Sequence, residues 1–141
     1  MKDYTLVIMN TNKRRELADS KYNERRAECD EVLKQLNTKY NFTNLCAATL
    51  ASIDELITDP ILKLRAQHVV GENLRVLQSV EVLKKGELET FGKLLNASHD
   101  SLKNNYEVTG LELDTIVDEA CKIKGCIGAR MTGAGFGGCA I

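Results

Sequence analysis

Four glycines fall within six positions near the end of the chain, at Gly133, Gly135, Gly137 and Gly138. Glycine tolerates positive φ angles, so such a loop can turn several backbone N–H groups toward one anion such as a phosphate. The glycines also have a dinucleotide-binding spacing, but three strand-like residues follow them instead of the helix that would receive a pyrophosphate. Two interpretations therefore stay open, a tight β-turn and a functional loop.

Tyr22 is the second candidate for a functional residue. It falls in the first turn of an expected helix that begins at Asp19 or Ser20, where backbone N–H groups have no intrahelical partner and small polar ligands can bind. Tyr22 also lies seven residues before Cys29, which is seven before Leu36, and this spacing is typical of one buried helix face. Spacing alone favours a packing role for Tyr22 over ligand binding.

Two neighbouring cations follow Tyr22. Arg25 and Arg26 could bind an anion through paired guanidinium hydrogen bonds. Glu24 and Glu28 lie beside these arginines, and exposed ion pairs on a helix contribute about 0.3–0.5 kcal/mol each. We therefore expect exposed ion pairs at these two arginines.

The histidines and the paired acids farther along give weaker signals. His68 and His99 fall in the middle of expected helices, without an acid at metal-ligand spacing, so packing roles are favoured over metal binding or base catalysis. Asp114 and Asp118 lie four residues apart, which is typical of charges on a helix surface. The sequence thus predicts no metal site.

Composition excludes several classes of protein. The chain has 141 residues, with 19 basic and 20 acidic side chains. It therefore has no excess of positive charge that would indicate binding to nucleic acid or to an anionic membrane. Its five cysteines are an odd number without a CxxC pair, which argues against a disulfide framework and favours a reducing compartment. No apolar run reaches the roughly 18 residues of a membrane span. We expect a soluble, cytoplasmic protein.

Periodicity and capping signals predict one helix-rich α+β domain over residues 1–141. The first part is a buried strand over 4–9, a helix from Asp19 or Ser20, and a short turn or helix near 52–55. A helix of more than twenty residues then begins at Pro60 with Asp59 as its cap, and further helices cover 87–104 and 111–124. A strand over 126–131 and the start of another at 138–141 flank the glycine loop.

Five segments carry a family resemblance. Residues 10–29, 65–73, 96–102 and 106–114 resemble segments of bacterial galactokinases in the same order, and 130–139 is similar to the third signature of the GHMP small-molecule kinases. The segment Ser20-Lys21-Tyr22-Asn23-Glu24-Arg25-Arg26 narrows the resemblance from the superfamily to the galactokinases. The implied fold is a GHMP-kinase C-terminal-type domain with a small, incomplete sheet.

The resemblance implies a reaction and roles for the two candidate sites. Galactokinases use ATP and Mg²⁺ to phosphorylate the 1-hydroxyl of galactose, and the tyrosine that corresponds to Tyr22 contacts the sugar. This reverses the packing interpretation of Tyr22. The glycine loop would support the phosphate-binding loop, so Gly133, Gly135, Gly137 and Gly138 are implied to have a scaffolding role.

Other parts of the family pattern have no counterpart here. The early sugar-binding segment, the nucleotide loop and the catalytic aspartate are not found, so we expect no catalytic or metal-binding residue in this chain, no cofactor bound to it and no activity on its own. We expect a C-terminal portion truncated at both ends, which self-associates through apolar surface. The alternatives are a related kinase, such as one acting on N-acetylgalactosamine, and a non-catalytic interaction module.

Overall fold

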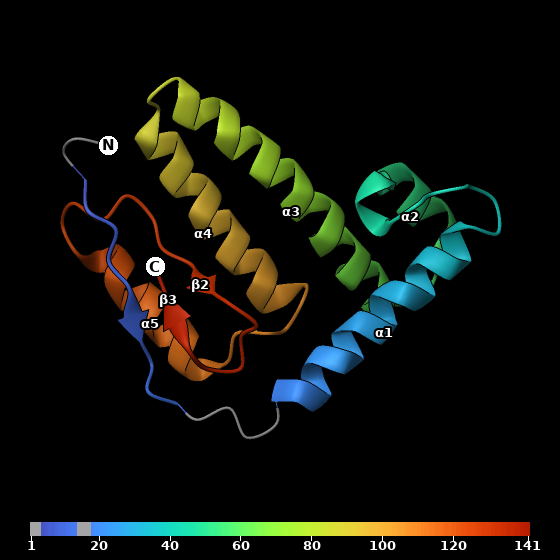
Figure 1. Ribbon diagram of the computed structural model, residues 1–141, viewed down its shortest axis with the longest axis horizontal. Coiled ribbons are helices and arrows are strands. Elements are labelled where there is room, and N and C mark those ends of the chain that lie inside the picture. The colour runs from blue at the N-terminus through green and yellow to red at the C-terminus, as the bar shows by residue number, and fades with distance from the viewer. Residues whose placement is uncertain (1–3, 14–17) are drawn as a thin grey trace.

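The computed structural model describes residues 4–13 and 18–141 and has a helix-rich α+β fold (Figure 1). Its elements follow the order β1 (Met9–Asn10), α1 (Ala18–Leu36), the 3-10 helix η1 (Leu45–Ala47), α2 (Leu50–Leu56), α3 (Pro60–Lys84), α4 (Leu88–Asn104), α5 (Leu111–Lys122), β2 (Met131–Thr132) and β3 (Cys139–Ala140). This confirms the predicted fold class.

Local signals set the ends of the long helix α3. The Asp59 carboxylate accepts hydrogen bonds from the N–H groups of Ile61 at 2.8 Å and Leu62 at 3.1 Å, and Pro60 occupies the first helical position. Gly86, with φ +75°, follows the last turn. The predicted start and approximate end of this helix are therefore confirmed.

The sheet brings the two ends of the chain together. Its three strands have the order β1-β3-β2, and both pairings are antiparallel. Ala140 in the central strand lies opposite Met9 on one side and Met131 on the other. As a result, β3 is held between the first described segment and the strand that leads into the glycine loop.

Two hydrophobic clusters stabilise the two ends of the molecule. The first joins α1, η1, α2 and α3 through Val32, Leu36, Leu45, Ala48, Ile53, Ile57, Ala66 and Val70. The second joins α4 and α5 to the sheet through Leu102, Val108, Leu113, Val117, Ala120, Ala129, Met131 and Ala140. In Figure 1, α1 and α2 lie at one end and the sheet with α5 at the other, and α3 and α4 lie between them.

The structure corrects the predicted extent of the strands. The apolar side chains of Leu6, Val7 and Ile8 are exposed, and only Met9 and Asn10 form β1. A strand needs a partner edge, and β3 pairs with β1 over only two residues. The prediction of a buried strand over 4–9 is therefore wrong for most of its length.

The predicted strand over 126–131 is also largely absent, because part of it packs on a helix instead. Backbone atoms of residues 127–128 lie directly against Gly92 of α4, where an added Cβ would lie 1.9 Å from the Ile127 carbonyl oxygen. The regular strand β2 begins only at Met131. Glycine at position 92 is what permits this close approach.

The apolar stripe of α3 is buried only in its first half. Ala66 and Val70 lie in the first cluster, whereas Leu74, Leu77 and Val80 are exposed. Among the helices of the described chain, none is both long and apolar enough to cross a membrane.

Candidate functional site

Tyr22 and the glycine loop line the same cavity, although more than a hundred residues separate them in the sequence. The cavity has a volume of about 410 Å³ and lies between α1, the end of α4 and the loop; its lining consists of Tyr22, Arg25, Arg26, Cys29, Leu102, Tyr106, Val108, Gly133, Ala134 and Phe136. The Tyr22 side chain is 53% exposed. The interpretation of Tyr22 as a core aromatic is therefore wrong, since α1 buries Leu36 but not Tyr22.

The glycine loop is fixed by backbone contacts on two sides. Gly135 has φ +82°, and a Cβ at this position would lie 2.0 Å from the Val108 carbonyl oxygen. The same oxygen accepts a 2.8 Å hydrogen bond from the Phe136 N–H. On the other side, the Thr11 N–H and hydroxyl both donate to the Gly138 carbonyl oxygen at 2.9 Å. The loop is thus a packed turn rather than an open connector.

The four glycines have different positions within this turn. Gly133 is exposed at the mouth of the cavity, Gly135 and Gly137 are buried, and Gly138 is partly buried. Only Gly133 of the four lines the cavity. The loop therefore offers one accessible glycine, and the other three shape its backbone.

Arg25 lies three residues after Tyr22 on α1 and is buried, which corrects the expectation of an exposed ion pair. Its guanidinium donates to the carboxylates of Glu28 at 2.5 Å and Glu24 at 2.7 Å. The predicted partners are therefore right and the predicted exposure is wrong. Arg26 has the expected surface position, with an exposed side chain 3.9 Å from the Asp30 carboxylate.

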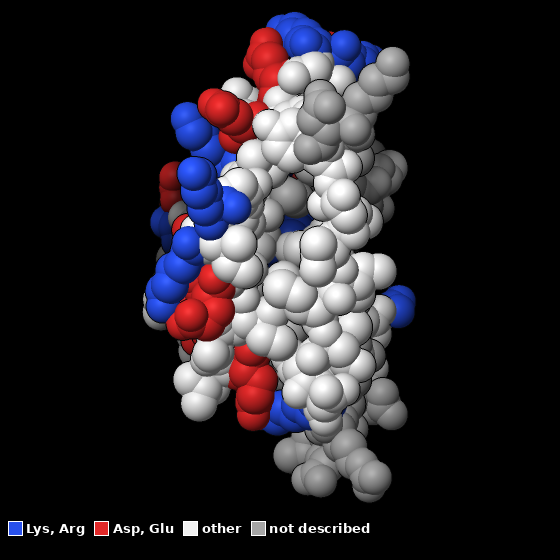
Figure 2. All heavy atoms as spheres, turned by 90° about the vertical axis from the view of Figure 1, so that its left-hand side faces the viewer, with Lys and Arg blue, Asp and Glu red and all other residues white. Residues whose placement is uncertain are grey.

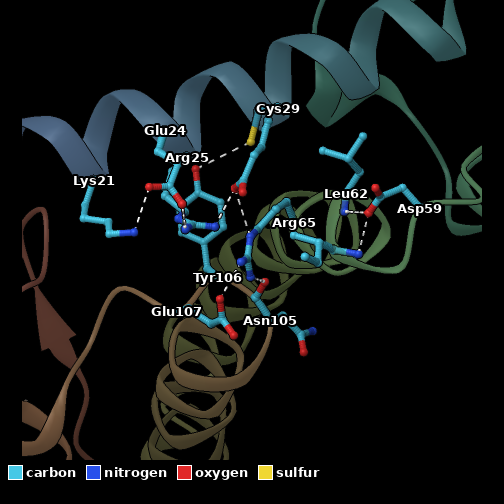
Figure 3. A network of polar contacts seen from close by, with 12 residues as sticks. Lys21, Glu24, Arg25, Cys29, Asp59, Leu62, Arg65, Asn105, Tyr106 and Glu107 are labelled. Atoms are coloured by element: carbon cyan, nitrogen blue, oxygen red, sulfur yellow. Dashed lines mark hydrogen bonds and ion pairs between the residues drawn. The ribbon is translucent and has the colours of Figure 1, made fainter.

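Arg65 of α3 connects α1 to the segment that follows α4, as Figure 3 shows. Its side chain is 3% exposed and donates to the Glu28 carboxylate at 3.0 Å, the Asn105 carbonyl oxygen at 2.6 Å and the Glu107 carboxylate at 2.5 Å. Glu28 thus accepts from both Arg25 and Arg65. This network fixes the helix that bears Tyr22 relative to the wall of the cavity.

Tyr106 is a partly buried residue of that wall. Its ring stacks on His68 with the ring centroids 4.4 Å apart, and its hydroxyl lies 3.6 Å from the Cys29 sulfur. Burial raises the pKa of the Tyr106 hydroxyl and that of the Cys29 thiol. Both groups are therefore neutral near pH 7.

His68 is a buried packing residue, as predicted. Its Nδ1 lies 2.9 Å from the Ser101 hydroxyl, and burial lowers the pKa of His68 to about 4. Because the unfolded chain binds this proton near pH 6.5, the free energy of unfolding should decrease by about 3 kcal/mol between pH 6.5 and pH 4.

Urea unfolding of wild type and His68→Phe across this range tests the prediction. The variant should lose most of this slope, because the phenyl ring can still stack on Tyr106 but cannot be protonated. Parallel pH profiles for the two proteins would contradict the assignment.

His99 of α4 and Asp114 of α5 lie against each other. Asp114 was expected on the surface, but its side chain is 16% exposed and its Oδ1 lies 3.3 Å from His99 Nε2. Lys103 approaches the other carboxylate oxygen of Asp114 at 3.4 Å. Burial lowers the pKa of His99, so this histidine is neutral near pH 7. The i,i+4 spacing of Asp114 and Asp118 gave no sign of a partner fifteen residues upstream.

The described lining of the cavity limits the chemistry it can perform. The hydroxyl groups of Tyr22 and Tyr106 and the exposed guanidinium of Arg26 suit a small polar or anionic ligand, whereas the Arg25 guanidinium is already paired with Glu24 and Glu28. No carboxylate or imidazole belongs to this lining, so the described residues offer neither a Mg²⁺ ligand nor a general base there. The arrangement can bind and orient a ligand, and a reaction would need further groups.

The C-terminal half of the chain matches a known protein family. Residues 79–141 match the family model described as GHMP kinases C terminal. This range covers the end of α3, all of α4 and α5, the sheet strands β2 and β3, and the glycine loop. These residues therefore form a GHMP-kinase C-terminal domain.

The similarity to one kind of GHMP kinase extends over nearly all of the chain. The chain is 58% identical to a galactokinase of Enterococcus faecalis over 99% of its length, and 55% identical to one of Clostridium acetobutylicum over all of it. It spans 37% of the length of these curated relatives. The crystal structure of Lactococcus lactis galactokinase complexed with galactose superposes with a TM-score of 0.90 at 53% identity, covering 94% of this chain and 35% of that one. The chain is thus a galactokinase-like sequence with the corresponding fold.

Proposed function

We propose that the chain is part of a galactokinase, in which it forms one side of the sugar site and supports the phosphate-binding loop. The whole enzyme would transfer the γ-phosphoryl group of ATP, with Mg²⁺, to the 1-hydroxyl of galactose. The observation that carries the proposal is the shared cavity of Tyr22 and the glycine loop. Relatives 55–58% identical over nearly all of the chain are named galactokinase, which favours galactose over N-acetylgalactosamine and a kinase over an interaction module.

Tyr22 and the loop would have distinct roles. The Tyr22 hydroxyl, at the exposed end of the cavity, would hydrogen-bond a sugar hydroxyl and orient the acceptor. Gly133 would let the loop pass close to the phosphate-binding segment, and Gly135, Gly137 and Gly138 would maintain the turn. Positioning of two substrates in this manner accounts for much of the catalysis of phosphoryl transfer.

We also propose that the isolated chain has no kinase activity, as a C-terminal portion truncated at both ends. Phosphoryl transfer needs a nucleotide cradle, metal ligands and a group that orients or deprotonates the nucleophile. The described lining of the cavity supplies no carboxylate or imidazole that could bind the metal or deprotonate the nucleophile. ATP and Mg²⁺ would therefore be bound mainly by residues of the whole enzyme that lie outside this chain.

A chimera tests the proposed function. This chain would replace the matching 35% of Lactococcus lactis galactokinase, and ADP release would be measured with galactose and with N-acetylgalactosamine. We expect turnover with galactose by the chimera and none by the 141-residue chain alone. A folded chimera that binds neither sugar nor nucleotide would contradict the proposal and favour an interaction module. A preference for the acetamido sugar would favour the related kinase.

Tyr22→Phe in the chimera should lower kcat/KM for galactose by about twofold to tenfold, the effect of one neutral hydrogen bond of ~0.5–1.5 kcal/mol. The thermal midpoint should not change, because the side chain is half exposed. Tyr40→Phe is the matched control, since that hydroxyl bonds Glu55 on the surface, away from the cavity. Equal kinetics for Tyr22→Phe and the control would mean that the hydroxyl does not contact the sugar.

The isolated chain should form dimers or larger oligomers through apolar surface. Figure 2 shows a face on which uncharged residues predominate, seen from the side of the N-terminal segment. Exposed apolar side chains of that segment include Leu6, Val7 and Ile8. Light scattering of the 141-residue chain measures its mass, and a monomer at all concentrations would refute self-association.

We further propose a cytoplasmic location. The five free thiols support it, because a reducing compartment keeps cysteines unpaired.

A further inference from the structure

The segment that leads into the glycine loop lies along α4, where Asn96 and His99 face it. We propose that Asn96 and His99 are positioning residues that set the register of residues 129–131 and, through it, the place of the glycine loop. The effect on catalysis rests on the proposed function, whereas the effect on register does not.

Two side chains of α4 bond the backbone of this segment. The Ala129 N–H donates to Asn96 Oδ1 at 2.8 Å, and the Met131 N–H donates to His99 Nδ1 at 3.2 Å. Asn96 and His99 lie three residues apart, on one face of the helix. Their acceptors therefore meet two N–H groups that are two residues apart and point to the same edge of an extended chain.

The other edge of the segment is paired with Ile141, the residue that follows β3. The Arg130 N–H and carbonyl bond the Ile141 backbone at 2.9 and 2.8 Å. Alternate residues of the segment thus bond Ile141 on one edge and α4 side chains on the other. Asn96 and His99 satisfy N–H groups that a fourth strand would otherwise bind.

A third connection runs through the side chain of Arg130. Its Nη1 donates to Glu72 at 2.9 Å, and the same Glu72 oxygen accepts from the Ser98 hydroxyl at 2.6 Å. Arg130 Nε also donates to the Met131 carbonyl oxygen at 2.9 Å. The side chain between the two bonded N–H groups is therefore attached to α3 and α4 as well.

The bond to Met131 specifies one form of His99. A backbone N–H can only donate, so Nδ1 must be unprotonated and the ring proton must lie on Nε2. Nε2 lies 3.3 Å from Asp114 Oδ1, although the two atoms do not meet hydrogen-bond geometry, and Asp100, Lys103 and Asp118 are among the other charged groups near the ring. Asp114 thus favours the tautomer that accepts from Met131.

A change of register would have a large consequence at the cavity. Ala129 and Met131 are buried, and a one-residue slip would exchange their environment with that of Arg130. Thr132 and Gly133 follow Met131 directly, and Gly133 lines the cavity. A slip would therefore change which residue of the loop lies at the cavity. In the observed register the two acceptors bond the N–H groups of the two buried residues, so they stabilise the register that burial of Ala129 and Met131 favours.

Amide hydrogen exchange and NMR of the 141-residue chain test the register directly. Scalar coupling between the Met131 N–H and His99 Nδ1 should be observed across the hydrogen bond. His99→Leu and Asn96→Leu should each speed exchange at Met131 and Ala129, respectively, by about tenfold or more. His99→Asn and Asn96→Asp retain an acceptor near the same place and should restore most of the protection. Absence of the coupling, or equal protection in His99→Leu and wild type, would overturn the proposal.

Kinetics of the chimera test the consequence for the reaction. His99→Leu should lower kcat/KM for ATP by about tenfold and change the KM for galactose by less than about twofold, and His99→Asn should recover most of the loss. Thr49→Ala, which removes the cap of α2, is the control for lost stability alone. Equal effects of His99→Leu and Thr49→Ala on ATP kinetics would overturn the positioning role. If the unsubstituted chimera is inactive, the proposed function fails, and the exchange experiment still decides the register.

Discussion

Gly135→Ala should destabilise the 141-residue chain by at least about 3 kcal/mol in urea unfolding and abolish activity of the chimera. Two costs combine at this position. The backbone has φ +82°, which strains an L residue, and the new Cβ would lie 2.0 Å from the Val108 carbonyl oxygen. That oxygen belongs to the backbone and accepts the Phe136 N–H, so it cannot move away without breaking the turn.

Gly86→Ala separates strain from the steric clash. Gly86 has φ +75°, but a Cβ there would have no atom within 4 Å. Gly86→Ala should therefore lower the free energy of unfolding by only about 1 kcal/mol and leave the chimera active. Equal destabilisation by the two substitutions would show that the loop is not packed against Val108 as described.

Arg65→Met should destabilise the chain by about 3–5 kcal/mol, because it removes one member of a buried ion network and leaves Glu28 with Arg25 alone. The Asn105 carbonyl would also lose its donor. The Glu107 pair adds little to this sum, since that carboxylate is largely exposed. Denaturant unfolding measures the loss, and the chimera should bind galactose more weakly because α1 is no longer fixed to the cavity wall.

Arg26→Met, at an exposed arginine of α1, is the control. The Arg26 side chain is 72% exposed and lies 3.9 Å from the Asp30 carboxylate, so Arg26→Met should change the free energy of unfolding by no more than about 0.5 kcal/mol. The double variant Arg65→Met with Glu28→Gln should recover part of the stability, since no buried carboxylate then lacks its partner. A small effect of Arg65→Met alone would mean that Arg25 suffices to neutralise Glu28.

The helices could be predicted from the sequence because their ends depend on nearby residues. Asp59 and Pro60 specify the start of α3, and Gly86 and Gly125 follow the ends of α3 and α5. The strands could not be predicted to the same extent. Apolar residues 4–8 have a strand composition, but strand formation depends on a partner edge that lies more than a hundred residues away.

The site was only partly predictable for the same physical reason. Resemblance identified Tyr22 and the glycine loop, and spacing alone placed Tyr22 in the core. Arg65 and Glu28 were not recognised as partners, because 37 residues separate them and each looks like an ordinary surface charge. Asp114 was placed on the surface because its contact with His99 depends on the packing of α5 against α4.

The most direct test of the central claim is a crystal structure of the chimera with galactose and a non-hydrolysable ATP analogue. We expect galactose in the cavity, with the Tyr22 hydroxyl in hydrogen-bond contact with the sugar and the glycine loop beside the segment that binds the phosphates. A structure in which both ligands are bound and the sugar lies outside this cavity, away from Tyr22, would contradict the account.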